Sequence, residues 1–421
     1  MTKQNGSLHG VRVVDMSRIL AGPWATQMLG DLGAEVIKIE RPVAGDDTRG
    51  WGPPYLRDTE GKETGESAFY LAANRNKKSV AIDIAQPEGA DLVRQLVADA
   101  DIFVENFKVG GLVKYGLDFA TLSAINPRLI YCSISGFGQD GPYADRAGYD
   151  FLIQAMGGLM SITGAPDGKP GAGPQKVGVG IVDIMTGLNA TIAILAALHD
   201  RTQTGHGQHV EASLLDTVVA TLANQASQFL LTGETPIRLG NAHPNIAPYQ
   251  DFPTEDGTII IAVGNDAQFA RMAEAMGHSE WARDPRYAAN RQRVENRESL
   301  VAIIADVTRG ATLHEWIARL EAKGVPCGPV NDIAEVFSDP HVVARGLKFD
   351  MQHPLAGNVP LVANPIRLNG APVAYRSPPP LLGEHTNEVL RQVLSLDEAA
   401  IKELEKKGAI QASPPNTATD I

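Results

Sequence analysis

The sequence predicts an α/β fold whose core is a parallel β-sheet. Short β-branched runs alternate with helical stretches through the first half of the chain, which is the pattern of βαβ units. Helices that connect parallel strands pack on the sheet, so both of its faces are expected to be covered. The chain has 421 residues, of which 43% are hydrophobic and 20% are charged, so two or three domains with ample core are expected.

The predicted elements follow one another regularly. Strands are expected at 11–16, 35–40, 79–83, 101–105, 129–134 and 209–213. Helices are expected at 24–32, 87–100, 181–200, 214–231 and 387–394. The first of these helices begins with Pro23 in its first turn, a position that tolerates a residue without an N–H.

The pattern of predicted secondary structure changes near residue 245. The segments 244–252 and 257–263 are typical of a β-hairpin, and helices follow to about residue 323. The sequence therefore predicts a smaller domain at 245–330. Residues 1–230 are expected to form the first part of the large domain, and 331–421 to return to it with a C-terminal helix and a frayed tail at 413–417.

Composition excludes several classes of function. The net charge of -12 argues against binding to nucleic acids or to acidic membranes. Residues 1–7 are polar and lack the apolar core of a signal peptide, and no apolar run is read as long enough to span a membrane, so a cytoplasmic enzyme is expected. Two cysteines, Cys132 and Cys327, are too few for a disulfide framework or a metal cluster and are interpreted as buried thiols.

Asp150 is the most informative single residue. It opens the apolar, glycine-punctuated segment 148–160. A carboxylate beside so much apolar surface is costly without a partner or a purpose, which indicates a catalytic role. The alternative is that Asp150 caps the helix that follows, because aspartate is a preferred N-cap residue.

The turn after the first strand does not carry a dinucleotide motif. Residues 18–23 contain no G-x-G-x-x-G, although the following helix could still bind a phosphate at its N-terminus. Several cations fall near the ends of predicted strands, where open α/β sheets bind ligands. They are compatible with a polyanionic cofactor that carries an adenine, or with ordinary solvated surface, and comprise Arg18, Lys38, Arg41, Arg75, Lys77, Lys78, Lys108 and Lys114.

Two other candidate residues can also be explained without a functional role. Asn106 could bond an adenine or a pantetheine amide, or it could be a turn residue. His243, in the glycine-led loop 240–244, could be a general base or simply exposed. The sequence contains no H-E-x-x-H, C-x-x-C or G-x-S-x-G, so metal-dependent and serine hydrolysis have no support.

Eight short segments between Leu8 and Leu394 together resemble the class III CoA-transferase family, which includes formyl-CoA, carnitine and bile-acid CoA-transferases. They lie at 20–23, 33–42, 74–79, 104–107, 148–150, 204–208, 328–330 and 380–386. The resemblance implies a Rossmann-like large domain with a parallel sheet, a smaller α+β domain, and a homodimer of two interlinked chains. It also implies acyl-CoA and a small carboxylic acid as substrates, with coenzyme A carried as acyl-CoA and no metal or redox cofactor.

The resemblance also assigns roles to residues. The family's nucleophilic aspartate falls on Asp150. Its CoA-binding positions fall on Arg18, Ile19, Leu20, Ala21, Arg41, Asn106, Phe107 and Lys114. The family's chemistry then implies covalent catalysis, in which Asp150 becomes a mixed anhydride and afterwards an aspartyl-CoA thioester.

Two rival functions stay open. The α-methylacyl-CoA racemases are similar to this chain but place a histidine before the aspartate. Here that residue is Tyr149, whose phenol is a poor base near neutral pH. The other rival is a non-catalytic acyl-CoA-binding protein, and the intact Asp150 argues against it.

The acceptor is expected to be a dicarboxylic acid and the donor succinyl-CoA. The segments 240–244 and 247–250 look more like those of succinyl-CoA–glutarate enzymes than of formyl-CoA enzymes. Gly240 is the candidate for oxyanion stabilisation or for a lid that excludes water. Arg49 and Arg146 could each grip the acceptor's second carboxylate, or both could be solvated or bind the CoA. His243 is expected to contact the substrate.

Overall fold

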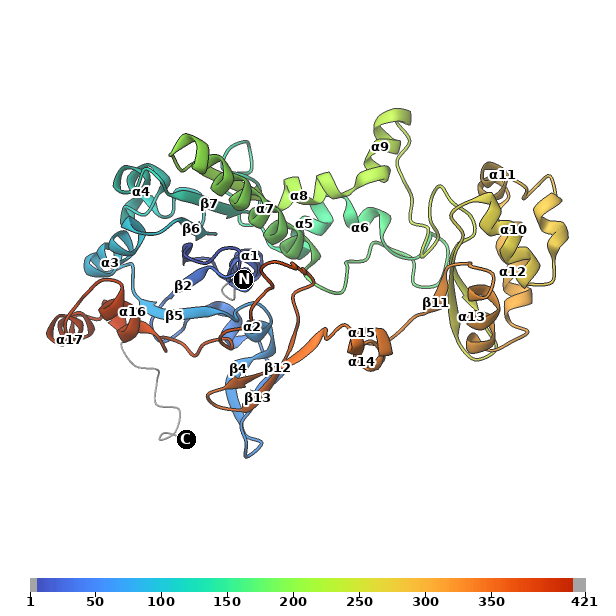
Figure 1. Ribbon diagram of the computed structural model, residues 1–421. Helices are drawn as coiled ribbons and strands as arrows, with labels where there is room; N and C mark the ends of the chain where they lie inside the picture. The colour runs from blue at the N-terminus through green and yellow to red at the C-terminus, as the bar shows by residue number, and fades with distance from the viewer. Residues whose placement is uncertain (1–5, 412–421) are drawn as a thin grey trace. The chain divides into compact units, whose positions relative to one another are not determined.

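The computed structural model describes residues 6–411 of the chain (Figure 1). The chain divides into two compact units. The first unit comprises Met1–Gly158, Val177–Ala226 and Val343–Ile421, and the second comprises Leu159–Lys176 and Ser227–Val342. The tail predicted at 413–417 lies outside the described residues.

A seven-stranded sheet forms the centre of the first unit. Its strand order is β14-β5-β2-β1-β6-β7-β8, and every neighbouring pair is parallel except β14 with β5. Without β14, this is the doubly wound order 3-2-1-4-5-6 typical of Rossmann folds. The predicted α/β fold with a parallel sheet is confirmed. The strands are β1 (Arg12–Asp15), β2 (Glu35–Glu40), β5 (Lys77–Ile82), β6 (Ile102–Glu105), β7 (Ile130–Ser135), β8 (His209–Ser213) and β14 (Ile410–Gln411).

Helices cover both faces of this sheet. On one face, strand side chains such as those of Val14, Ile37 and Phe103 form a core with helices α3, α4, α16 and α17. On the other face, α1 and α7 pack against each other and against the strands (Figure 1). These helices are α1 (Ala21–Asp31), α3 (Pro87–Ala98), α4 (Phe119–Ile125), α7 (Ile181–Thr204), α16 (Thr386–Gln392) and α17 (Glu398–Lys406).

Helix α7 is the longest helix among residues 6–411. It has 24 residues and is long and apolar enough to cross a membrane by length and composition, although the sequence was expected to contain no such run. Buried residues such as Val182, Ala190 and Ile194 face its neighbours, and α7 packs against α1, β7 and β8. Those contacts are typical of a core helix of an α/β domain.

Two hairpins extend the first unit beyond the predicted elements. They are β3 (Tyr55–Arg57) with β4 (Glu63–Ser67), and β12 (Lys348–His353) with β13 (Gly357–Val362). Leu71, on helix α2 (Ala68–Ala72), packs with Val359 and Leu361 in a small core of its own. The remaining elements of this unit are η1 (Asp47–Gly50), η2 (Val113–Tyr115), α5 (Asp150–Met156) and α8 (Leu214–Thr221).

The second unit is built on a three-stranded antiparallel sheet. The predicted hairpin corresponds to β9 (Tyr249–Pro253) and β10 (Thr258–Ala262), and β11 (Cys327–Pro329) pairs with β10. Phe252, Ile259 and Trp316 belong to its core. Its helices are α6 (Leu159–Ile162), α10 (Asp266–Ala275), η3 (Ser279–Arg283), α11 (Asn290–Glu295), α12 (Arg297–Thr308), α13 (Leu313–Glu321) and α14 (Ile333–Ser338).

The second unit is larger than the domain expected at 245–330. It gains the remote segment 159–176 because Gly240 N donates to Gly164 O at 3.1 Å and Arg238 pairs with Asp167. Long-range contacts of this kind leave no periodic signal in the sequence. Two helices cross the boundaries between the units, namely α9 (Ala223–Thr232) and α15 (Pro340–Ala344). The single helix expected at 214–231 is broken into α8 and α9, with Ala223 at a φ of 47°.

Candidate active site

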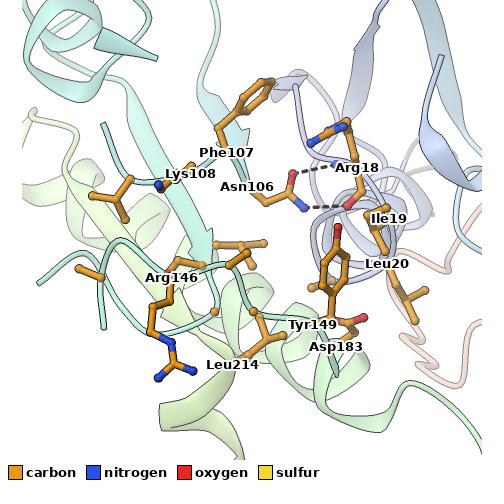
Figure 2. A pocket seen from close by; sticks show the side chains of 18 of the residues that line it. Arg18, Ile19, Leu20, Asn106, Phe107, Lys108, Arg146, Tyr149, Asp183 and Leu214 are labelled. Atoms are coloured by element: carbon orange, nitrogen blue, oxygen red, sulfur yellow. Dashed lines mark hydrogen bonds between the residues drawn. The ribbon is translucent and has the colours of Figure 1, made fainter. Parts of the chain in front are cut away.

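The loops after β1 and β6 meet at the topological switch point of the sheet. Adjacent strands β1 and β6 continue into helices on opposite faces, and the crevice outside their carboxyl ends is where doubly wound folds bind ligands. Arg18 N donates to Asn106 Oδ1 at 2.9 Å, and Asn106 Nδ2 donates to Arg18 O at 2.7 Å (Figure 2). The structure thus brings together the predicted turn 18–21 and the predicted contact at Asn106.

The turn at Ile19 is held in an unusual backbone conformation. Ile19 has a φ of 73°, a region that a β-branched residue enters only at a cost of about 1–3 kcal/mol. Its N–H donates to Asp46 Oδ1 at 3.2 Å, and Lys38 Nζ donates to Asp46 Oδ2 at 2.9 Å. Burial alone would raise the pKa of Asp46, but Lys38 and the N–H of Thr48 hold that pKa at about 2. An ionised side chain therefore fixes the turn.

The carboxylate of Asp150 caps helix α7, although Asp150 itself lies in helix α5. It is the first residue of α5, whose N-cap is Tyr149. Its Oδ2 accepts the N–H of Val182 at 2.8 Å and that of Asp183 at 3.3 Å, both in the first turn of α7. Its Oδ1 accepts Gln154 Nε2 at 2.5 Å. The simple alternative, that Asp150 caps the helix it begins, is therefore wrong, and its carboxylate instead closes the N-terminus of α7.

This arrangement makes a site for negative charge. The backbone N–H groups in the first turn of a helix have no helical partners and carry the positive end of its dipole. Two of those groups already contact Asp150 Oδ2. An oxygen that became an oxyanion on the same carbon would find its donors in place, which is the requirement for electrostatic stabilisation of a tetrahedral intermediate.

Asp183 is a second carboxyl group in this site, and the sequence reading missed it. Burial raises the pKa of Asp183, and the charge of Asp150 raises it further, to about 7. A Cβ placed on Gly180 would lie 3.7 Å from Asp183 Oδ2 and 3.8 Å from Asp150 Cγ, so the two carboxyls flank this glycine. An acid three residues after a glycine, at the head of an apolar helix, is the signal that could have revealed it.

A cavity of about 310 Å³ joins these features. Its wall includes Leu20 and Ala21 of the first turn, Phe107, and Asp183 (Figure 2). Arg18 stands over the ring of Phe107 at 5.6 Å from its centroid. The predicted positions at 18–21, 106 and 107 therefore line one cavity, and Asp150 lies directly beside its wall residues Tyr149 and Asp183.

Two further cavities continue along the carboxyl edge of the sheet. One of about 330 Å³ contains Arg41 and shares Arg18 and Phe107 with the first cavity. The next, of about 430 Å³, contains Lys114 and shares Tyr115 with its neighbour. Among the predicted cations, Arg18, Lys108, Arg41 and Lys114 thus line these neighbouring cavities, as the binding of a long polyanion requires. The others are engaged elsewhere: Lys38, Lys77 and Arg75 are buried in ion pairs with aspartates, and Lys78 pairs with Glu35 and Glu388.

Arg49 does not have the role that was expected of it. It is 8% exposed, and its guanidinium binds both oxygens of Glu40, the carboxylate of Glu66, the hydroxyl of Tyr70 and the carbonyl of Pro380. These partners occupy the donors of its three nitrogens, so none is left for an acceptor carboxylate. Arg49 is a structural residue that neutralises two buried acids.

Arg146 is placed differently. It is exposed and lines the first cavity, where its guanidinium lies 4.6 Å from the centroid of Tyr143 and 5.1 Å from that of Phe137. Figure 2 shows this guanidinium directed away from the Arg18–Asn106 pair. Among residues 6–411 no carboxylate forms an ion pair with it, so its charge is available to a ligand.

Gly240 and His243 belong to the second unit. Gly240 has a φ of 63°, which a glycine adopts without strain. His243 Nδ1 accepts the N–H of Asn245 at 3.1 Å, and partial burial, with the nearby Arg297, lowers the pKa of this histidine. Both residues lie outside the first unit that carries Asp150, and their expected roles at the substrate stay predictions.

Comparison with known proteins decides the family. The model of CoA-transferase family III matches residues 8–386. The chain belongs to this family. It is 48% identical over 400 residues to a succinate–glutarate CoA-transferase of Agrobacterium fabrum, covering 95% of this chain and 99% of that one. It is 42% identical over 403 residues to the human succinyl-CoA:glutarate CoA-transferase, covering 96% and 90%.

Solved structures agree with this assignment. The crystal structure of a CaiB/BaiF family protein from Brucella suis superposes with a TM-score of 0.80 at 51% identity, covering 92% of this chain and 99% of that one. The chain is therefore a class III CoA-transferase. Within the described part of the chain, no three His, Cys, Asp or Glu side chains come together as a metal site.

Proposed function

We propose that this CoA-transferase moves CoA from succinyl-CoA to a small dicarboxylic acid through an aspartyl-CoA thioester on Asp150. The names of the relatives from Agrobacterium fabrum and from humans support the donor and the class of acceptor. The observation that carries the mechanism is the contact of Asp150 Oδ2 with the N–H groups of Val182 and Asp183.

The reaction consists of four displacements. Asp150 attacks the thioester carbon of succinyl-CoA, the C–S bond breaks, and a mixed anhydride and CoA thiolate form. The thiolate attacks the Asp150 carbonyl, so that succinate leaves and an aspartyl-CoA thioester remains. The acceptor carboxylate attacks this thioester to form a second anhydride and free thiolate. The thiolate then attacks the acceptor's acyl carbon, which yields the new acyl-CoA and restores Asp150.

The position of Asp150 suits these steps. Attack on its carbonyl carbon turns one of its own oxygens into an oxyanion, and the N–H groups of Val182 and Asp183 already contact that oxygen in the resting enzyme. No reorganisation of the protein is needed as the charge develops, which is the source of electrostatic catalysis. Exclusion of water from the closed site would protect the anhydride from hydrolysis.

The dicarboxylate preference has a candidate residue in Arg146. Arg146 lines the cavity, its guanidinium lies beside the rings of Phe137 and Tyr143, and no carboxylate of the described residues pairs with it. A fork of this kind binds a carboxylate through two parallel hydrogen bonds. We propose that Arg146 neutralises the acceptor's second carboxylate, because an unpaired buried charge is very costly.

Intact-mass measurement tests the covalent step. After incubation with succinyl-CoA alone, the wild-type protein should gain the mass of CoA minus one water, and added glutarate should remove that gain. Asp150→Ala should show no gain, while it still binds CoA and loses only about 1 kcal/mol of stability, the usual cost of a lost helix cap. A CoA adduct or substantial transfer in folded Asp150→Ala would contradict the mechanism.

Isotope exchange separates transfer from racemisation. Tyr149 lines the cavity where the racemases have a histidine, and its phenol is a poor base near neutral pH. We therefore expect succinyl-CoA recovered from deuterated buffer to carry no deuterium at its α-carbon. Enzyme-dependent deuterium there, without CoA transfer, would favour the racemase alternative.

A further inference from the structure

Two carboxyl groups stand beside one glycine in this site, and their surroundings differ. Asp150 accepts hydrogen bonds from three N–H donors. No side-chain hydrogen bond joins the Asp183 carboxyl to another of the described residues, although its backbone N–H donates to Asp150. The two carboxyls therefore differ in their contacts, because donors surround the carboxylate of Asp150 and none from the described residues is bonded to that of Asp183.

We propose that Asp183 is the general acid–base of the transfer, which gives a proton to the departing CoA sulfur and takes it back before the sulfur attacks. This role rests on the proposed covalent transfer at Asp150. It assigns a second catalytic residue, whose task is to keep the CoA thiol inside the site while the anhydride exists.

The geometry carries this assignment. A Cβ on Gly180 would lie 3.7 Å from Asp183 Oδ2, 3.8 Å from Asp150 Cγ and 3.1 Å from Leu20 Cδ2. The space in front of Gly180 is thus bounded by both carboxyls and by the turn expected to bind CoA. The thioester sulfur is bonded to the carbon that Asp150 attacks, so it must lie within this same space.

The proton balance closes without another reactant. As the C–S bond breaks, neutral Asp183 donates its proton to the sulfur, so that CoA leaves as the thiol instead of the free thiolate and Asp183 becomes a carboxylate. In the next step this carboxylate removes the same proton, and the thiolate attacks the Asp150 carbonyl of the anhydride. The acceptor half of the reaction repeats both transfers in the same order, so Asp183 ends each cycle protonated.

The acidity of Asp183 matches the task. Burial and the charge of Asp150 raise the pKa of Asp183 to about 7, and an ordinary thiol has a pKa of about 8.5. Efficient general acids and bases have pKa values near the working pH. Neighbouring carboxyls in different environments are a usual sign of divided acid and base roles.

Other groups around Asp183 do not compete for this role. Asp150, on α5, is the charged neighbour that acts on the Asp183 pKa. The remaining titratable residues that line the cavity are Arg18, Lys108, Asp145, Arg146 and Tyr149. The elements packed against α7 contribute neutral residues to the cavity, namely Ala21 of α1, Ile134 and Ser135 of β7, and Leu214 of α8.

The test compares Asp183→Asn with a matched control. Asparagine keeps the shape of the side chain but cannot exchange a carboxyl proton. The control is Asp216→Asn, because Asp216 occupies the same third position in helix α8 and is exposed to solvent. Asp183→Glu restores a carboxyl. The measured quantity is the single-turnover rate of succinate release from saturating succinyl-CoA, from below to above pH 7.

The wild type and Asp216→Asn should release succinate at a rate that falls above about pH 7, as the acid form of Asp183 is lost. Asp183→Asn should be slower by about 100-fold and lack this fall, since general acid–base catalysis contributes about 10²–10⁴-fold. Asp183→Glu should recover part of the rate and part of its fall above about pH 7. An Asp183→Asn protein with the wild-type rate and profile, or with only a raised KM, would overturn the inference.

The two proposals fail in distinguishable ways. If wild-type protein gains no CoA mass and transfers no CoA, the proposed covalent function fails whatever Asp183 does. If wild-type protein gains the adduct and Asp183→Asn does so equally fast at every pH, covalent transfer stands and the role of Asp183 is refuted.

Discussion

Replacing Asp183 with asparagine should stabilise the protein, and more so at higher pH. The pKa of this carboxyl lies near 7 in the folded chain and near 3.8 without its surroundings, because burial and then the charge of Asp150 disfavour its ionised form. A raised carboxyl pKa means that the folded state binds more protons than the unfolded state between these values. The contribution of Asp183 to the free energy of unfolding therefore falls as the pH rises between these two pKa values.

The size of the effect follows from the two pKa values. Their separation corresponds to at most about 4 kcal/mol, at 1.36 kcal/mol for each pH unit. The penalty is absent below the unfolded pKa, grows between the two values and is complete above 7. Asp183 is partly exposed, so solvent screening reduces it. Between about pH 5 and about pH 8 we expect the advantage of Asp183→Asn to grow by about 1–3 kcal/mol.

Urea unfolding of the wild type, Asp183→Asn and Asp216→Asn at these two pH values measures the effect. The difference between variant and wild type cancels the pH response of every group that does not interact with Asp183. The Asp216→Asn control removes an acid from the same position of α8, where the side chain is exposed to solvent. A stability difference for Asp183→Asn that is independent of pH, or that shrinks as pH rises, would refute the electrostatic account of this site.

Three other variants address single assignments. Arg41→Ala should raise the KM for acyl-CoA with little change in kcat, most strongly at low salt. Replacing the exposed Arg57 with alanine should leave this KM unchanged. An unchanged CoA affinity in Arg41→Ala would reject the contact between Arg41 and CoA. Arg49→Ala should cost about 3–5 kcal/mol of unfolding free energy, because Glu40 and Glu66 lose their buried partner; a loss below about 1 kcal/mol would contradict this. Arg146→Ala should lower kcat/KM for glutarate more than for a monocarboxylate. If the wild-type kcat/KM for formate or carnitine exceeds that for the dicarboxylates by about tenfold, the acceptor assignment is wrong.

Much of the first unit could be predicted because its strands and helices follow local patterns. The runs at 35–40 and 209–213 became strands with the same bounds, and Pro23 lies in the first turn of α1. The hairpin β12–β13 was missed because it depends on packing against Leu71, far away in the sequence. The segment 159–176 joined the second unit for the same kind of reason, through hydrogen bonds to a remote loop.

The site was predictable only where the sequence carries a local signature. Arg18 and Asn106 follow strand ends, and parallel strands bring those ends together. Arg49 was assigned wrongly because its partners Glu40 and Glu66 are not recognisable as partners until the chain folds. Asp183 was missed because it reads as one polar residue in an apolar helix, and its relation to Asp150 spans 33 positions of the chain.

Ile19 and Asp183 break local rules of stability in the same cavity. A β-branched residue at a φ of 73° is strained, and a half-buried carboxyl without a cation beside it is costly. Arg49 also lies buried, but its acids and hydrogen bonds satisfy it fully, so it breaks no such rule. Strain and unpaired charge persist where function requires them, because mutations that relieve them are easily found. We infer that the strained turn at Ile19 and the carboxyl of Asp183 lie at the reacting end of the groove, whereas Arg49 belongs to the scaffold that supports it.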